Sequence, residues 1–197
     1  MRRYALVMVL ALLAGCASTG LRYHTLQPAA GNPGISTSTF KARLTVVQVP
    51  AEVDTEQLVV RASGNTLVRE STDRWAAPLT DEIRGALDDA WRRDYALEDV
   101  QGVGGVPHST LQVGLQVQKL DATMGSHVEL VANWWVSVDQ EQGLKSWSCQ
   151  RVFVDQAGVG IDELVNAQQR VFHSLAGEMA SSVIAVINRQ APVCQVH

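Results

Sequence analysis

The sequence predicts an α+β domain in which two helices pack on one face of an antiparallel or mixed β-sheet. In two stretches, 111–118 and 128–138, apolar residues alternate with other residues, as in strands that bury one face. In two others, 75–91 and 161–187, apolar residues recur every three or four positions, as on one face of a helix. Elements that each bury a single face must pack together in layers, which gives the α+β arrangement.

The first residues are typical of a bacterial export signal. Arg2 and Arg3 are followed by the uncharged run 4–13, which is shorter than the roughly 20 residues that span a bilayer. The run ends in Leu13-Ala14-Gly15-Cys16, which resembles the lipobox of bacterial lipoproteins. We therefore expect a signal peptide at 1–15 that is cleaved, and a lipid on Cys16.

Lipid on Cys16 has consequences for where the protein resides. The thiol accepts a diacylglyceryl group and the freed amine is usually acylated as well, and two or more chains give stable anchoring. Ala17-Ser18 follows Cys16, without the Asp that marks retention at the inner membrane. We therefore expect an outer-membrane lipoprotein with its domain on the periplasmic face.

The composition of the mature chain limits its partners. From Cys16 to His197 it has 182 residues, enough for one domain with a sizeable core. It carries 14 basic and 20 acidic residues, a formal charge of −6, which argues against nucleic acid and anionic headgroups as main ligands. No second apolar stretch approaches 18 residues, so we expect a protein that is anchored to the membrane and does not span it.

Residues 16–40 are predicted to form a lipidated flexible tether, because they are rich in turn-forming residues. Tyr23–Leu26 is expected to add only a short extended piece. Fully extended, the tether from Ala17 to Phe40 would reach roughly 80 Å. The folded domain is expected at 41–197.

The folded domain is predicted to begin with three short strands and a helix. Residues 43–49 are rich in β-branched residues and are followed by Pro50, which ends the strand. Residues 57–62 and 66–70 flank a Ser-Gly-Asn turn, as in a hairpin. A helix is predicted at about 76–94, with Pro78 in its first turn.

Charged residues along this helix are expected to stabilise it. Acidic residues lie near its amino end and basic residues near its carboxyl end, and Asp88–Arg92 and Asp89–Arg93 are spaced as i,i+4 pairs. The carboxylates at 81–89 are expected to form a solvated helix face.

The second half of the chain is predicted to contain three strands and a long helix. Short connections at 121–126 and 139–144 make the strands antiparallel neighbours, the third strand being 145–154. The helix is expected at about 161–188. The glycine-rich stretch 101–107 does not open a helix, so we expect a loop and no phosphate site.

Two cysteines remain once Cys16 carries lipid. Because the periplasm is oxidising, Cys149 and Cys194 are predicted to form a disulfide that ties the last strand to the carboxyl-terminal tail. The alternative is two independent thiols. In the chain-entropy model, a loop of about 45 residues makes such a bond worth roughly 4 kcal/mol.

Three segments together resemble the PqiC/YmbA family, the ABC-type transport auxiliary lipoproteins of MCE-type systems. They are Val47-Gln48-Val49-Pro50, Gln57-Leu58-Val59-Val60-Arg61 and Asp73-Arg74-Trp75-Ala76-Ala77-Pro78-Leu79, in this order and spacing. The chain departs from the family pattern at Val53-Asp54-Thr55-Glu56, where members often have an aromatic residue or Leu and an Arg-Pro.

The resemblance implies a role in the envelope. Such lipoproteins work with an inner-membrane transporter component and a periplasmic MCE-domain protein, form ring-like homo-oligomers, and help to move lipids and to maintain membrane integrity. A second hypothesis, from another class of protein, is a periplasmic lipid-binding carrier with an internal apolar pocket.

Catalytic chemistry is not predicted. The histidines lack metal-ligand spacing, and we expect surface or capping roles for them; they are His24, His108, His127, His173 and His197. No hydrolase or metalloprotease motif occurs. We therefore expect no catalytic residue, metal or cofactor, and an envelope enzyme is the least favoured hypothesis.

Three residues are candidates for contacts with a subunit or partner. For Arg74 and Trp75 we favour a structural role, in which Trp75 packs against the core at the helix entrance while Arg74 caps or pairs. The alternative is a contact with a subunit or partner, because Trp and Arg are enriched at interface hot spots. By alternation, Trp135 faces away from Trp134. If helices cover Trp134, then Trp135 lies on the open face of the sheet.

Overall fold

The computed structural model describes residues 20–28, 40–100, 111–140 and 143–194. The predicted signal peptide, Cys16, the glycine-rich stretch and part of the expected tether lie outside these residues. Within them, the chain forms an α+β fold with two sheets and two helices.

The larger sheet has five strands in the order β5-β2-β6-β7-β8. These are β2 (Phe40–Gln48), β5 (Leu97–Asp99), β6 (Leu111–Ala122), β7 (His127–Gln140) and β8 (Gly143–Gln156). β5 and β6 run parallel to β2, whereas β6, β7 and β8 are antiparallel neighbours. The prediction of a mixed sheet with three consecutive antiparallel strands is confirmed.

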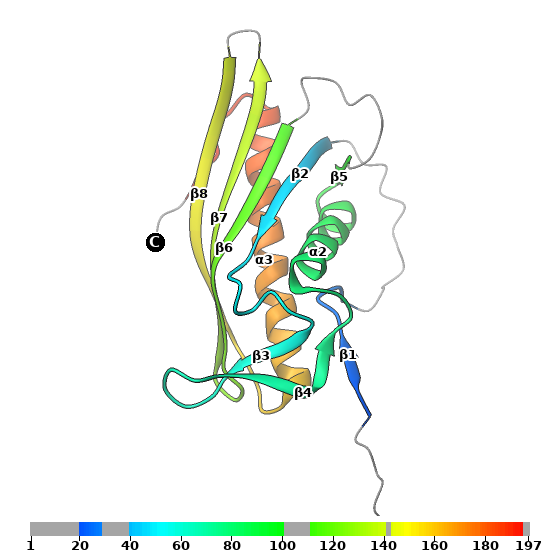
Figure 1. The fold of residues 1–197 in the computed structure, drawn as a ribbon. Coiled ribbons are helices and arrows are strands. Elements are labelled where there is room, and N and C mark those ends of the chain that lie inside the picture. Colours follow the sequence, from blue (N-terminus) through cyan, green and yellow to red (C-terminus); the bar gives the residue numbers. More distant parts are fainter. Residues whose placement is uncertain (1–19, 29–39, 101–110, 141–142, 195–197) are drawn as a thin grey trace, which may run out of the picture.

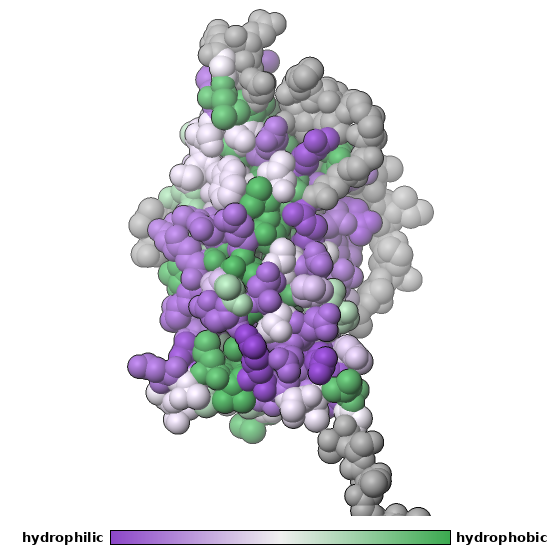
Figure 2. All heavy atoms as spheres, in the orientation of Figure 1, coloured by the Kyte–Doolittle hydropathy of each residue, from purple (hydrophilic) through white to green (hydrophobic). Residues whose placement is uncertain are grey.

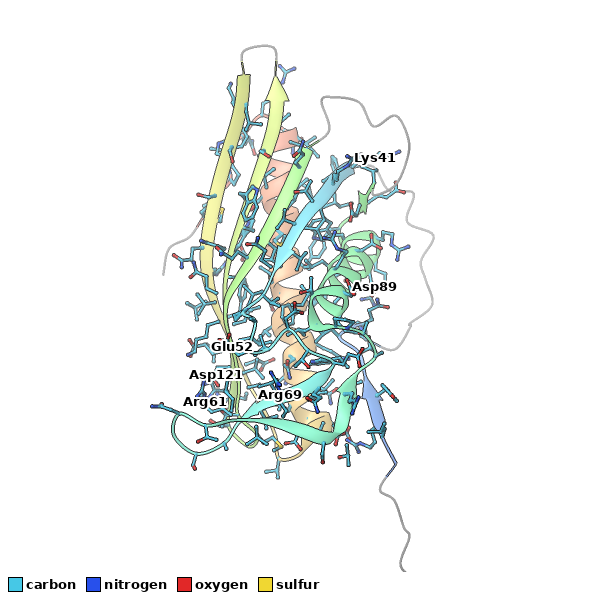
Figure 3. The ribbon with its side chains drawn as sticks, viewed as in Figure 1. Lys41, Glu52, Arg61, Arg69, Asp89 and Asp121 are labelled. Atoms are coloured by element: carbon cyan, nitrogen blue, oxygen red, sulfur yellow. A yellow bond between two sulfur atoms is a disulfide. The ribbon has the colours of Figure 1, made fainter. Side chains whose placement is uncertain are left out.

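The smaller sheet has the order β1-β4-β3, with β1 (Arg22–His24), β3 (Gln57–Arg61) and β4 (Leu67–Trp75). β3 and β4 form the predicted hairpin, and β1 adds a parallel strand to β4. An ion pair of 2.6 Å between Arg61 Nε on β3 and Asp121 Oδ1 on β6 holds the hairpin against the larger sheet (Figure 3).

Both helices lie on the same side of the larger sheet (Figure 1), as predicted. They are α2 (Leu79–Asp94), which contacts β2 and β5, and α3 (Ile161–Ile187), which contacts β6, β7 and β8. Side chains fill the layer between helices and sheet, among them Leu115, Leu130, Trp91, Phe172 and Met179, each at most 1% exposed. In the described part of the chain, neither helix has the length and apolar character needed to cross a membrane.

The first helix begins three residues later than predicted. Its N-cap is Pro78, whose φ of −51° and ψ of 144° are extended, and a proline also disfavours helical geometry in the preceding residue. Trp75 therefore ends strand β4 and does not begin the helix face. The two predicted helix ion pairs form, at 3.3 Å between Asp88 and Arg92 and 2.9 Å between Asp89 and Arg93.

Part of the expected tether belongs to the folded domain. β1 pairs with β4 in the register Arg22↔Asp73 to His24↔Trp75, and Leu26 is a core residue at 1% exposure. The burial of Leu26 stabilises the attachment of this segment to the domain. The composition of residues 16–40, which is rich in turn formers, does not indicate such an attachment. The prediction of a flexible tether from 16 to 40 is wrong for residues 22–27, whereas the short extended piece expected at Tyr23–Leu26 overlaps strand β1.

Candidate functional site

The segment Arg22–Gln27, here called the strap, connects the expected lipid anchor to the domain. It crosses one end of the molecule beside β4, α2 and α3 (Figure 1). Two carboxylates fix it, Asp73 from β4 and Glu82 from α2. The sequence indicates this role for neither residue: Asp73 only opens a family-like segment, and Glu82 only belongs to the carboxylates at 81–89.

Asp73 is the centre of the first contact. It is only 6% exposed, and its Oδ1 atom accepts from Arg22 Nε at 2.8 Å and lies 2.7 Å from His24 Nε2. Thr72 Oγ1 donates to its other oxygen at 2.8 Å. Burial alone would raise the pKa of Asp73, but the hydrogen bonds from His24, Arg22 and Thr72 outweigh it and lower the pKa to about 2.

Arg22 also connects the strap to α3. Its Nη2 atom lies 3.0 Å from Asp162 Oδ1, in the first turn of that helix. Arg22 therefore bridges a strand and a helix that are far apart in the sequence. His24, expected on the surface, has a side chain only 11% exposed because Asp73 holds it inside this cluster.

Glu82 is the centre of the second contact. Its Oε2 atom accepts from Thr25 Oγ1 at 2.7 Å and from the Leu26 backbone N–H at 2.9 Å. Glu82 is 6% exposed, so the expectation that the carboxylates at 81–89 all form a solvated face is wrong at this position. A buried carboxylate needs such donors, because burial without them is costly.

The strap also contacts both helices through its backbone and Gln27. Gln169 Nε2 on α3 donates to the Thr25 carbonyl at 2.9 Å. The Gln27 side chain lies so close to Gly85 on α2 that a Cβ atom there would overlap it. The strap is thus held by hydrogen bonds, an ion-pair cluster and one buried leucine.

The docked strap shortens the reach of the expected anchor. Cys16 lies four residues before Gly20, the first described residue, and four residues extend at most about 14 Å. This bound replaces the roughly 80 Å expected for a tether that runs free to Phe40. The end of the domain where Gly20 lies must therefore stay close to any lipid carried by Cys16.

The structure places the three candidate contact residues on two different sheets. Trp75 is 3% exposed, and its backbone N–H donates to the Glu56 carbonyl at 2.6 Å, which favours the core interpretation of this residue. Arg74 is half-buried on β4, opposite Tyr23 of the strap. Trp135 lies on β7 of the other sheet, so the three do not form one site.

Trp135 occupies the sheet face that the helices leave uncovered. Its neighbour Trp134 points to the helices and donates through Nε1 to Ser182 Oγ at 3.0 Å. Trp135 is half-buried and lies against Gly114, its partner on β6. The strands β6 to β8 otherwise expose mainly amides and valines on this open face, among them Gln112, Gln116, Gln118, Gln150, Val152 and Val154.

The structure joins Cys149 and Cys194 in a disulfide with Cα atoms 5.2 Å apart. Cys149 lies on β8 with 5% exposure, and Cys194 belongs to the tail after α3. The bond holds this tail beside the outermost strand of the larger sheet.

Two of the remaining histidines each lie beside one polar side chain. His173 lies 2.9 Å from Asp94, and His127 lies beside Ser126, whereas His108 and His197 are outside the described residues. Within the described ranges, no group of three or more His, Cys, Asp or Glu side chains is placed to hold a metal ion.

Comparisons with known proteins identify the family of this chain. Residues 24–180 match the family model described as "ABC-type transport auxiliary lipoprotein component". No curated protein matches the chain significantly.

Two crystal structures share the fold. One is of a Xanthomonas campestris protein of the DUF330 family, with 12% identity and a TM-score of 0.62, covering 85% of this chain and 98% of its own. The other is of an uncharacterized protein, with 16% identity and a TM-score of 0.60, covering 82% of this chain and 97% of its own.

Proposed function

The chain belongs to the family of ABC-type transport auxiliary lipoprotein components, and from this premise we propose that it is an outer-membrane-anchored, non-enzymatic accessory subunit of an MCE-type lipid transport system. In this role Cys16 carries the lipid, and the domain docks a periplasmic MCE-domain protein that connects to an inner-membrane component. The protein thereby helps to maintain membrane integrity.

The observation that carries the proposal is the docked strap. A simple anchor needs only a flexible linker, whereas here Asp73, Glu82 and Leu26 fix the chain to the domain just after the expected lipid site. Such an attachment holds the domain near one membrane in a restricted orientation. A subunit that must receive a partner at a defined place benefits from that restriction.

The dimensions of the domain fit the same role. α3 has 27 residues and at 1.5 Å per residue extends about 40 Å. It runs along the three long strands away from the end with the strap (Figure 1). Because both helices cover the other side of these strands, the open face of the sheet, with Trp135 on it, is available to a partner or a neighbouring subunit in the periplasm.

A carrier that encloses lipid is supported less well. Such a protein needs an interior apolar cavity, but the layer between sheet and helices contains large buried side chains such as Trp91, Phe172 and Leu115. Hollows lined by described residues open at the surface, for example between α2 and α3 beside Leu26 and His173. We therefore favour docking over carriage.

In-cell photo-crosslinking tests the proposal. A photoreactive amino acid at Gln116 or Val152 samples the open face, and one at the exposed Asn166 on α3 is the matched control. We expect crosslinks from the open face to an MCE-domain protein or a second copy of this chain, and not from Asn166. Crosslinks to neither from the open face would contradict the docking role.

The anchor is tested separately by mass spectrometry of the mature protein. The expected amino terminus is Cys16 with a diacylglyceryl group and an added acyl chain, located in the outer-membrane fraction. A Cys16→Ala variant should lose the lipid and leave the membrane. A wild-type mass without lipid would contradict the anchor, whatever the crosslinking shows.

A further inference from the structure

One end of the molecule gathers exposed apolar side chains around the point where the chain approaches its expected anchor. Val159 is 89% exposed, Leu21 50% and Met124 40%. Single exposed apolar residues are ordinary on protein surfaces, so their placement together is what requires an explanation.

Two loops at this end are joined into a single rim. The Gly125 N–H of the β6–β7 turn donates to the Gly158 carbonyl at 2.9 Å, and the Ala157 N–H donates to the Ser126 carbonyl at 3.0 Å. A Cβ atom on Gly125 would lie 3.5 Å from Val159 Cγ2, so Val159 lies over the turn next to Met124. These contacts place the two apolar side chains on one surface.

The amino-terminal segment reaches the same rim. Gly20 and Arg22 line one shallow groove together with Val159 and Asp162, which brings Leu21 to this end of the molecule. The β3–β4 hairpin, which exposes Leu67 and Val68, lies there as well (Figure 1). Figure 2 shows apolar side chains at this lower end, among polar neighbours.

The fold itself does not require an exposed valine at residue 159. Val159 lies between Gly158 and Gly160, and Gly160 has a φ of +104°, a backbone conformation that favours glycine. The two glycines let the loop turn with its one side chain directed outward. Val159 buries little surface within the domain, so it contributes little to folding.

We propose that Leu21, Met124 and Val159 form a membrane-contact rim that rests in the interface of the phospholipid bilayer. The inference rests on the proposed lipid at Cys16, from which Gly20 is at most about 14 Å away along the chain. The strap then keeps the rim facing the membrane. Apolar side chains at this distance lose water contact when they enter the headgroup region, which favours the orientation.

The surrounding charges indicate which lipids suit the rim. Asp162 and Glu163 follow Val159 by a few residues and are exposed, whereas Arg22 is partly neutralised by Asp73 and Asp162. The described residues at this end form no cationic cluster, because Arg61 pairs with Asp121 and Arg69 is a single exposed arginine on the hairpin. Such a surface gains little from anionic lipid. The contact is therefore mainly apolar, and zwitterionic phosphatidylethanolamine is sufficient for it.

A depth measurement on the acylated full-length mature protein tests the proposal. Val159→Cys carries a polarity-sensitive fluorophore, and the protein is reconstituted in vesicles of phosphatidylethanolamine and phosphatidylglycerol that contain nitroxide lipids. The control is Leu144→Cys, which is also exposed, at 68%, but lies near the other end of β8. The two sites are separated by about 40 Å of strand.

We expect nitroxide lipids to quench the probe at residue 159 about threefold or more above the probe at residue 144, because only the first reaches the interface. Omission of phosphatidylglycerol should change the ratio by less than about twofold. Equal quenching at both sites in protein that carries lipid would overturn the proposal, and so would quenching that requires phosphatidylglycerol.

Two further readouts separate this inference from its premise. Protein that lacks the acyl mass and does not float with vesicles indicates failure of the anchor at Cys16, not of the rim. The Cys16→Ser chain without vesicles should leave the probe at residue 159 in water. A probe already shielded there would show that a second copy or another protein covers the rim, which would also overturn the proposal.

Discussion

Trp135 lies against Gly114, its cross-strand partner on β6, so closely that a Cβ atom at residue 114 would overlap the six-membered ring of the indole. Because residue 114 has no side chain, there is space on β6 for the indole of Trp135, the largest side chain of the open face. Glycine inside a strand is otherwise unfavourable, and here an aromatic ring covers the backbone that it leaves exposed.

Gly114→Ala should therefore destabilise the domain by about 1–3 kcal/mol, because the methyl group forces the indole off its seat. Urea unfolding measures the change. In a Trp135→Ala background the same substitution should cost little, since the clash is gone. Gln112→Ala, on the same strand and face, is the control and should change the unfolding free energy by less than about 0.5 kcal/mol. Equal costs of Gly114→Ala in both backgrounds would refute the explanation.

Trp135→Glu should disrupt assembly if the open face is a subunit interface. A charge placed where an aromatic ring is buried between subunits costs several kcal/mol, enough to dissociate a ring at micromolar concentration. Light scattering measures the particle mass, and Trp135→Phe, which keeps an aromatic ring, should retain it. A folded Trp135→Glu protein with the wild-type mass would count against this interface.

The strap should loosen in acid. The pKa of Asp73 is about 2 in the folded protein, below the ordinary 3.8, so ionised Asp73 favours the folded state. This contribution, on the order of 2 kcal/mol, is fully present above about pH 5 and is lost as the pH falls towards 2. Asp73→Asn should remove that part of the pH dependence, whereas Asp162→Asn, whose side chain is 71% exposed, should leave most of it. Urea unfolding at pH 3 and pH 7 measures this. If the unfolding free energy changes by the same amount between the two pH values in wild type and in Asp73→Asn, the assignment to Asp73 is wrong.

Local patterns in the sequence predicted most of the fold. In α3 and in strands β6 to β8, apolar residues repeat with the helix or strand period over many positions. The long helix and the three antiparallel strands were therefore predictable. β5 has only three residues, Leu97–Asp99, too few for any period to appear. The separate three-stranded sheet also escaped prediction, because β1 is equally short and its partner β4 lies about 50 residues away.

The site was harder to predict for a related reason. Trp135 could be placed on the open face by simple alternation. The burial of Glu82 instead depends on Thr25 and Leu26, which arrive from 57 and 56 residues away in the sequence. The helix period places Glu82 only at the edge of the apolar stripe, where a carboxylate is ordinarily exposed. Tertiary hydrogen bonds of this kind leave no mark on local periodicity.

Glu82 and the exposed Asp81 beside it give a matched pair of variants. Glu82→Ala should release the strap, because the Leu26 N–H and the Thr25 hydroxyl lose their acceptor, at a cost of about 1–3 kcal/mol. Asp81→Ala, at an exposed position on the same turn, removes only a favourable interaction with the helix dipole and should cost less than about 1 kcal/mol. Hydrogen exchange reports the difference directly, since the Leu26 amide should lose protection in the first variant only. Protection of Leu26 that survives Glu82→Ala would show that its buried side chain, not the carboxylate, holds the strap.

The disulfide should stabilise the domain mainly through its effect on the unfolded chain. Cys149 and Cys194 are 45 residues apart, and closing a loop of this size restricts the unfolded ensemble by roughly 4 kcal/mol in the chain-entropy model. Alkylation without reductant should leave both thiols unlabelled, and two labelled thiols would contradict the bond. Reduction should then lower the unfolding free energy by about 2–4 kcal/mol. A Cys194→Ser variant should show the same loss in unfolding free energy and no further response to reductant. Cys194 lies in the tail after α3, so it stabilises the domain through the cross-link and not through burial of its side chain.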